Sequence, residues 1–149
     1  ILLMQGGYPV IFYGDYYSIS HAADAEEEAE GVPETVDGKV REASPHRRII
    51  DILLDARKRY AYGDQTLLFD HCSTVGLVRH GDGEHPGSGL VLVMSNGADG
   101  AKDVCLGEDH AGEVWHEITG SIADTVTLDG SGCASFATRG RNIAVWVKA

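Results

Sequence analysis

Between residues 66 and 149 the sequence alternates short β-rich runs with clusters of turn-forming residues, and this pattern constrains the fold more than any other feature. The turn clusters include SNGADG, GEDHAG and DGSG, and no helical period runs through this half of the chain. Regularly spaced short strands predict an antiparallel β-sandwich. The predicted strands are 66–69, 75–80, 89–94, 102–106, 113–118, 125–128, 134–138 and 142–148.

The last run, NIAVWVK, alternates strictly between two faces. Its odd-numbered apolar residues are Ile143, Val145 and Val147, and Ala144 and Trp146 lie on the other face. This period of two supports a strand that closes the sandwich.

One amphipathic helix is predicted before the strands, over residues 45–62. Ser44 and Pro45 are typical of the residues that begin a helix, and Gly63 follows as a stop signal. Basic residues gather near the end, where the helix dipole favours cations, and Asp55 is placed to pair with Arg59. The apolar face is predicted to comprise Ile49, Ile50, Leu53, Leu54, Ala56 and Tyr60.

The first 43 residues divide into an apolar part and an acidic part. Residues 1–6 are typical of a helix end stopped by glycine, and 9–13 contain the continuous apolar run VIFY, which predicts a strand buried on both faces in a parallel sheet. Residues 18–43 are acidic and interrupted by Gly and Pro, which favours a solvated surface insertion. A cation-binding or partner-binding loop is the alternative there.

Composition excludes some classes of function. A net charge of −11 argues against a nucleic-acid partner, because phosphate contacts require clustered Lys and Arg. No apolar stretch is long enough to span a bilayer. Three cysteines without a CxxC pair suit a reducing compartment, or at most one disulfide with one spare thiol. We therefore expect no membrane and a cytoplasmic location.

Three residues are candidates for substrate binding. Asp15 follows the predicted buried strand, at the end where α/β folds place their sites, although capping of the strand end is the alternative role. Trp115 and Trp146 could provide a platform on which sugars stack, or could simply fill the core of the sandwich. No second acid is placed beside Asp15 by the sequence, so no catalytic pair is predicted.

Nucleophile, phosphate and metal motifs are not evident. The glycine-rich stretch 81–89 lacks the Gly-Lys-Ser/Thr ending of a phosphate loop and predicts a long hairpin loop. Asp70, His71 and Cys72 are three ligand types in a row, but neighbours on a strand point to opposite faces, so a polar turn is favoured over a metal site. Residues 95–103 lack the acids of an EF-hand and predict a turn.

Several blocks, taken together and in order, resemble the C-terminal third of α-amylases, of the liquefying bacterial type and its fungal intracellular relatives. The blocks are GGYPVIFYGDYYSI, IIDILLDARKRYAYGDQTLLFDH, VGLVRHGDGEHPGSGLVLVMSNG, GEVWHEITG and NIAVWVKA. The resemblance implies the end of a (β/α)8 barrel in residues 1–64 and a C-terminal antiparallel Greek-key β-sandwich in 65–149. Within the first part, 1–6 would be the tail of barrel helix 7, 9–13 strand 8 and 45–62 helix 8.

The resemblance also implies an activity and what this chain lacks for it. The family hydrolyses internal α-1,4-glucosidic bonds of starch or glycogen with retention, but the positions of its three catalytic acids would precede Ile1. We therefore expect the chain to be inactive alone, with an α-glucan and the rest of the barrel as partners of the parent enzyme. Calcium is a cofactor of the parent family. Ser73 and Asn96 stand where some relatives have carboxylate ligands, so no calcium site is expected here. The alternative is a non-catalytic β-sandwich that binds a glycan or a protein.

Overall fold

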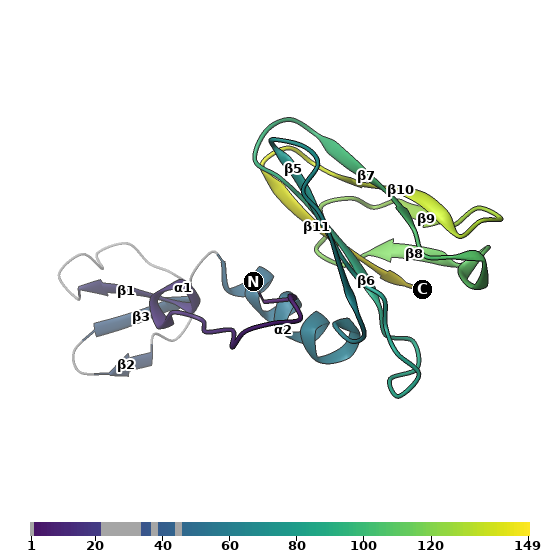
Figure 1. Cartoon of the computed structure of the whole chain (residues 1–149). Coiled ribbons are helices and arrows are strands. Elements are labelled where there is room, and N and C mark those ends of the chain that lie inside the picture. Colours follow the sequence, from purple (N-terminus) through teal and green to yellow (C-terminus); the bar gives the residue numbers. More distant parts are fainter. Residues whose placement is uncertain (1, 22–33, 37–38, 44–45) are drawn as a thin grey trace.

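The computed structural model describes residues 2–21, 34–36, 39–43 and 46–149, and the side chains of 18–45 are left out of the description. The described chain is a small, mostly antiparallel β domain with two α-helices. Figure 1 shows the strands β4–β11 gathered at one end, with the helix α2 packed beside them.

A six-stranded antiparallel sheet forms the larger layer, in the order β4-β5-β6-β11-β8-β9. Its strands are β4 (Gln65–Leu68), β5 (Thr74–Arg79), β6 (Leu90–Ser95), β8 (Val114–Glu117), β9 (Thr125–Thr127) and β11 (Asn142–Lys148). A two-stranded ribbon, β7 (Gly100–Cys105) with β10 (Cys133–Thr138), forms the second layer. All eight predicted strands are confirmed to within a few residues, because each is bounded by a turn signal.

The core between the two layers is built by aromatic and β-branched side chains from both sheets. Trp115, Phe136 and Trp146 form two edge-to-face ring pairs there, with centroids 5.7 and 5.8 Å apart. The predicted alternation of β11 is confirmed, because Ala144 and Trp146 face this core while Val145 and Val147 face the opposite side. Both faces of β11 are therefore buried.

The opposite, outer face of the large sheet is covered in part by α2 (Arg47–Tyr60) and by residues 2–4. Ile50 and Ala56 of α2 are buried, and Leu53 and Tyr60 pack against the second core cluster. Leu54 does not follow the prediction, since 38% of it stays exposed. The i,i+4 pair of Asp55 with Arg59 is confirmed at 3.3 Å.

The beginning of α2 differs from the prediction. The helix starts at Arg47 after His46, which makes no side-chain capping hydrogen bond. The proposed cap at 44–45 lies outside the described residues. The helix ends at Tyr60, before Gly63, whose φ of +72° and close approach to the Gly81 carbonyl leave no room for a side chain.

Residues 9–13 do not form the predicted strand in this structure. Residues 8–12 have no regular secondary structure, and Tyr8, Val10 and Phe12 are 91, 76 and 69% exposed. A strand needs neighbours for its backbone groups, and the described residues place no strand beside this segment. Tyr13 instead begins a four-residue helix, α1 (Tyr13–Tyr16).

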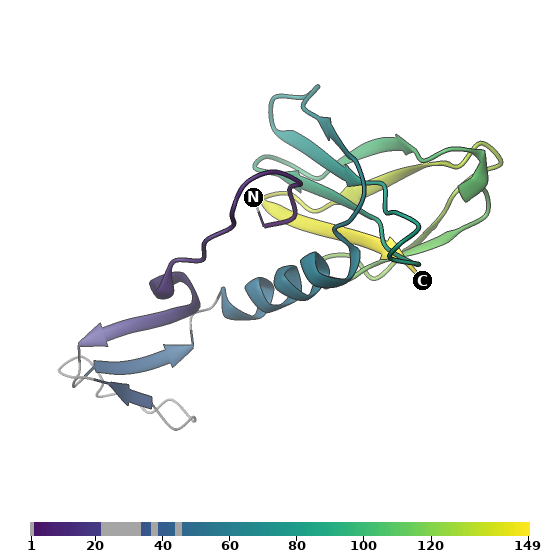
Figure 2. The same ribbon diagram turned by 60° about the horizontal axis from the view of Figure 1, so that its bottom comes forward.

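The acidic insertion contains strands that the sequence pattern did not predict. β1 (Tyr17–His21), β3 (Lys39–Ala43) and β2 (Glu34–Val36) pair antiparallel in that order. Figure 2 shows this small sheet beyond the start of α2, away from the two-layered domain. Most of the acidic run, 22–33, lies outside the described residues, so the cation-binding and partner-binding alternative is not addressed by the fold.

Candidate functional site

Asp15 is exposed on the short helix α1 and has no strand beneath it. No hydrogen bond or ion pair engages its carboxylate within the part of the chain that the structure describes. The nearby carboxylate of Asp51 is already bonded, at 2.6 Å, by the hydroxyl of Tyr16. Retaining glycosidases need two positioned carboxylates about 5 Å apart, and among the described residues no interaction links Asp15 to a second carboxylate.

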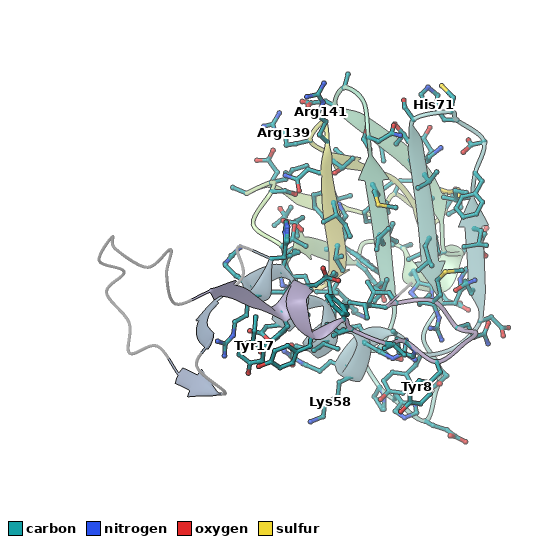
Figure 3. The ribbon with its side chains drawn as sticks, turned by 90° about the vertical axis from the view of Figure 1, so that its left-hand side faces the viewer. Tyr8, Tyr17, Lys58, His71, Arg139 and Arg141 are labelled. Carbon is teal, nitrogen blue, oxygen red and sulfur yellow. A yellow bond between two sulfur atoms is a disulfide. The ribbon has the colours of Figure 1, made fainter. Side chains whose placement is uncertain are left out.

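Tyr16 and Tyr17, which follow Asp15 in the sequence, link α1 to α2. The rings of Tyr16 and Tyr17 lie 4.8 Å apart, and the guanidinium of Arg47 lies over both at 5.0 and 5.3 Å. The hydrogen bond to Asp51 raises the pKa of the Tyr16 hydroxyl, and Tyr16 in turn raises the pKa of Arg47. Figure 3 shows Tyr17 and Tyr8 on the α2 side of the molecule, far from His71 and Arg141.

Trp115 and Trp146 lie in the core between the layers, with 3 and 1% of their surface exposed. The indole N–H of Trp146 donates to the carbonyl of Ala137 at 3.0 Å, and that of Trp115 to Glu113 at 3.3 Å. A sugar stacks on an open ring face, and neither indole offers one. The structure therefore favours the core role for both tryptophans.

Of the three candidate metal ligands at positions 70–72, Asp70 and His71 already make contacts within the protein. The Nδ1 of His71 accepts from the backbone N–H of Ser73 and Thr74, and Asp70 pairs with the buried ammonium of Lys102, which lowers the pKa of that carboxyl. Across the described ranges, no three His, Cys, Asp or Glu side chains gather as metal ligands would. Residues 81–89 lie in the hairpin loop between β5 and β6, as predicted, whereas the turn predicted over 95–103 is limited to residues 96–99, because β7 already begins at Gly100.

The outer face of the large sheet carries a pocket of about 280 Å³ with an apolar lining. Leu67, Phe69 and Met94 border it and are 40, 65 and 44% exposed. We call these three side chains the outer apolar face. Segment 8–12 also leaves large apolar side chains open, since Tyr8, Val10 and Phe12 are exposed. Such surfaces mark interaction sites in proteins.

Two arginines hold the N-terminal residues against this face. Arg57 of α2 donates to the carbonyls of Leu2 and Met4, and Arg79 of β5 donates to the carbonyl of Leu3 at 3.1 Å and to that of Gly63 at 2.8 Å. Burial and the repulsion of Arg57 lower the pKa of Arg79. Sequence patterns miss this contact because both guanidinium groups bond backbone oxygens.

Two carboxylates missed by the sequence analysis organise the end of the sheet. Glu117 accepts six hydrogen bonds, five of them from the following loop. Burial alone would raise the pKa of its carboxyl, but the bonds from Thr119 and the backbone bring that pKa below its usual range. Glu113 binds Lys148 at 2.6 Å and His110 at 3.1 Å, and these donors outweigh burial and lower its pKa.

Comparison with known proteins gives matches along nearly the whole chain. Glucan 1,4-alpha-maltohexaosidase of Bacillus sp. (strain 707) is 39% identical over 146 residues, which are 98% of this chain and 24% of that protein. Alpha-amylase of Geobacillus stearothermophilus is 38% identical over 99% of this chain and 23% of its own length. Cytoplasmic alpha-amylase of Escherichia coli (strain K12) is 37% identical over 99% of this chain and 28% of its own length.

Other comparisons add less. No protein-family model matches the chain. A solved structure of an alpha-amylase from Malbranchea cinnamomea aligns with 68% of this chain and 20% of its own chain, at 13% sequence identity. The TM-score of 0.43 is too low to bear on the fold.

The resemblance to the C-terminal region of bacterial α-amylases is thus confirmed by sequence similarity, and the chain spans about a quarter of the length of these relatives. One of the relatives is cytoplasmic by name. Among the described residues, no helix is long and apolar enough to cross a membrane.

Proposed function

We propose that this chain, similar along its length to the C-terminal region of bacterial α-amylases, serves as that region of a longer α-amylase. The parent enzyme would hydrolyse internal α-1,4-glucosidic bonds of starch or glycogen with retention of configuration. The sequence similarity over 98% of the chain, at 39% identity, is the observation that carries this proposal.

In this proposal residues 1–64 complete a (β/α)8 barrel and residues 65–149 form a Greek-key sandwich that packs on it. The apolar surfaces support this division. Segment 8–12 is extended and exposed although its residues are those of a buried strand, and neighbouring barrel strands would pair with its backbone and cover Val10 and Phe12. The outer apolar face would meet the rest of the barrel in the same way.

The chain supplies structure to this enzyme and none of its three catalytic acids. Asp15 is an exposed acid that comes shortly after the proposed strand 8, and a double displacement requires a nucleophile and an acid/base placed on opposite sides of the bond. We propose that Asp15 lies at the rim of the completed site, that calcium is bound by the parent enzyme outside this chain, and that the α-glucan contacts the missing barrel.

The test is the reading frame that precedes the codon for Ile1. We expect an in-frame extension that encodes the remaining barrel strands and their three acids. The extended polypeptide should hydrolyse amylose and release the α-anomer first, as seen by proton NMR. An extension without those acids, or release of the β-anomer, would contradict the proposal.

A non-catalytic glycan-binding or protein-binding sandwich is the second candidate. The observation in its favour is the open apolar surface, which suits a protein partner as well as it suits a barrel. Retention of the chain on an amylose column, and its loss in a Trp115→Ala variant that still folds, would support glycan binding. The burial of both tryptophans predicts no retention.

A further inference from the structure

A single disulfide joins the two strands of the second layer. Cys105 ends β7 and Cys133 begins β10, and the two residues lie directly opposite each other with their Cα atoms 4.0 Å apart. The next pair in the ladder is hydrogen bonded, since the N–H of Leu106 donates to the carbonyl of Gly132 at 2.9 Å. Cys105 and Cys133 therefore occupy a non-hydrogen-bonded position, where side chains come closest.

The disulfide lies where the ribbon has least support of its own. β7 and β10 pair only with each other, and a two-stranded ribbon is marginally stable alone. The two backbones also approach closely next to the disulfide, at Gly107 and Gly132. A Cβ atom on Gly132 would lie 1.8 Å from the carbonyl oxygen of Gly107. We call residues 105–113 and 128–133 the clamped end.

Besides the disulfide, the clamped end is held by Leu106, which packs against the core, and by Glu113, which binds Lys148 at 2.6 Å. Backbone bonds run from Gly112 to Leu128 and from Leu128 to Glu113, at 3.1 and 2.9 Å. Leu128 is the buried apolar side chain of this end, whereas Glu108, Asp109 and Ala111 are exposed. The cross-link also closes a long stretch of chain, since its cysteines are 28 residues apart. By loop-closure arguments such a bond stabilises mainly through the unfolded state.

We propose that the Cys105–Cys133 disulfide is a redox-sensitive clamp on the second layer. Oxidised, it holds the clamped end over the core; reduced, it lets this end open while the six-stranded sheet stays folded. Cys105 is exposed, so a dithiol reductant can reach the bond. Two electrons and two protons convert the S–S bond to two thiols as the reductant becomes a disulfide, and oxidised glutathione reverses the step and leaves as two reduced glutathiones.

The redox state of the Cys105–Cys133 disulfide depends on the compartment in which the chain is located. Disulfides persist in oxidising compartments and are reduced in the cytosol. In this proposal the clamped end is closed in an oxidising compartment and open in the cytosol, which is the location expected from the sparse cysteines.

Cys72 provides an internal control. It is an exposed free thiol in the turn before β5. Thr74 packs against Gly100, the first residue of β7, whereas Cys105 is its last. Five residues of strand, about 16 Å, separate the two ends, so Cys72 does not exchange with the disulfide in the folded chain.

The first measurement counts thiols on the full 149-residue chain. Alkylation with N-ethylmaleimide in denaturant, read by intact mass, should give one adduct on protein isolated without reductant and three after treatment with a phosphine reductant. The Cys72→Ser variant should give no adduct before reduction and two adducts after it. Three adducts on the wild-type chain isolated without reductant would overturn the proposal.

The second measurement locates the effect by hydrogen exchange. Reduction should speed exchange at Leu106, Gly112 and Leu128 at least tenfold more than it speeds exchange in the β6–β11 ladder. The midpoint of thermal unfolding should fall by about 10 °C. The double variant Cys105→Ser/Cys133→Ser should match the reduced protein; if it does not fold, reduction and reoxidation of the wild type supply the same comparison. Equal exchange in both redox states, or uniform acceleration throughout the chain, would overturn the proposal.

Discussion

Replacement of Glu117 by Gln should destabilise the chain far more than a surface substitution does. Glu117 is the last residue of β8, and its carboxylate ties the loop after the strand to β11. One oxygen receives three hydrogen bonds at 2.5–3.0 Å and the other receives three at 2.8–3.4 Å. The donors are the backbone N–H groups of Thr119, Gly120, Ser121, Ile122 and Val145 and the hydroxyl of Thr119.

The magnitude follows from the bonds that the amide cannot accept. A glutamine turns one of the two oxygens into an N–H₂ group that faces donors, so three N–H or O–H groups lose their acceptor. Each buried donor left unpaired costs about 1–3 kcal/mol, and the exposure of Gly120 reduces the total. We expect a loss of about 3 kcal/mol, or a fall of about 10 °C in the unfolding midpoint.

The effect should also depend on pH. The folded pKa of Glu117 is lowered, so the ionised carboxylate stabilises the fold above its unfolded pKa of about 4.3, and this stabilisation disappears as the pH falls through the folded value. Urea unfolding at pH 7 and at pH 3 should therefore show a large difference between wild type and Glu117→Gln that shrinks in acid. The matched control, Glu84→Gln in the exposed 81–89 loop, should change little. A Glu117→Gln chain as stable as wild type at pH 7 would refute the reasoning.

Two further substitutions test close packing and the N-terminal attachment. Gly132→Ala should lower the free energy of unfolding by about 2 kcal/mol or more, because its Cβ would strike the Gly107 carbonyl and its φ is +72°. Gly130 has open space around it, so Gly130→Ala should be nearly neutral in the same urea titration. Arg79→Met should cost about 2–3 kcal/mol by releasing two backbone carbonyls and should speed hydrogen exchange at residues 2–5, whereas Arg141→Met, an exposed residue, should do neither. If the two glycine variants lost equal stability, or the two arginine variants did, the contact proposed for Gly132 or for Arg79 would be contradicted.

The sequence predicts the two-layered domain well because its signals are local. Each strand of residues 65–149 is bounded by a turn cluster, and the alternation in β11 marks two buried faces. The helix α2 shows the limit of such signals. Leu54 fits the apolar period, yet it stays exposed because the outer face of the sheet lies under only part of the helix.

The site was less predictable because its contacts are not local. The run VIFY predicts burial, but burial requires neighbouring strands, and the described residues place none around 8–12, so Asp15 has no strand to follow. The partners of Glu117 and Arg79 are backbone groups, which every residue type carries. Three cysteines permit three pairings, and only the register of β7 with β10 selects Cys105 and Cys133.

The central claim is that the chain contributes structure, and none of the three catalytic acids, to an α-amylase. Release of reducing ends from amylose, measured with the purified 149-residue chain beside the polypeptide extended in frame at its N-terminus, tests this claim most directly. We expect sustained hydrolysis by the extended polypeptide. We expect no hydrolysis by the 149-residue chain or by its Asp15→Asn variant. Turnover by the 149-residue chain, abolished by Asp15→Asn, would contradict the account.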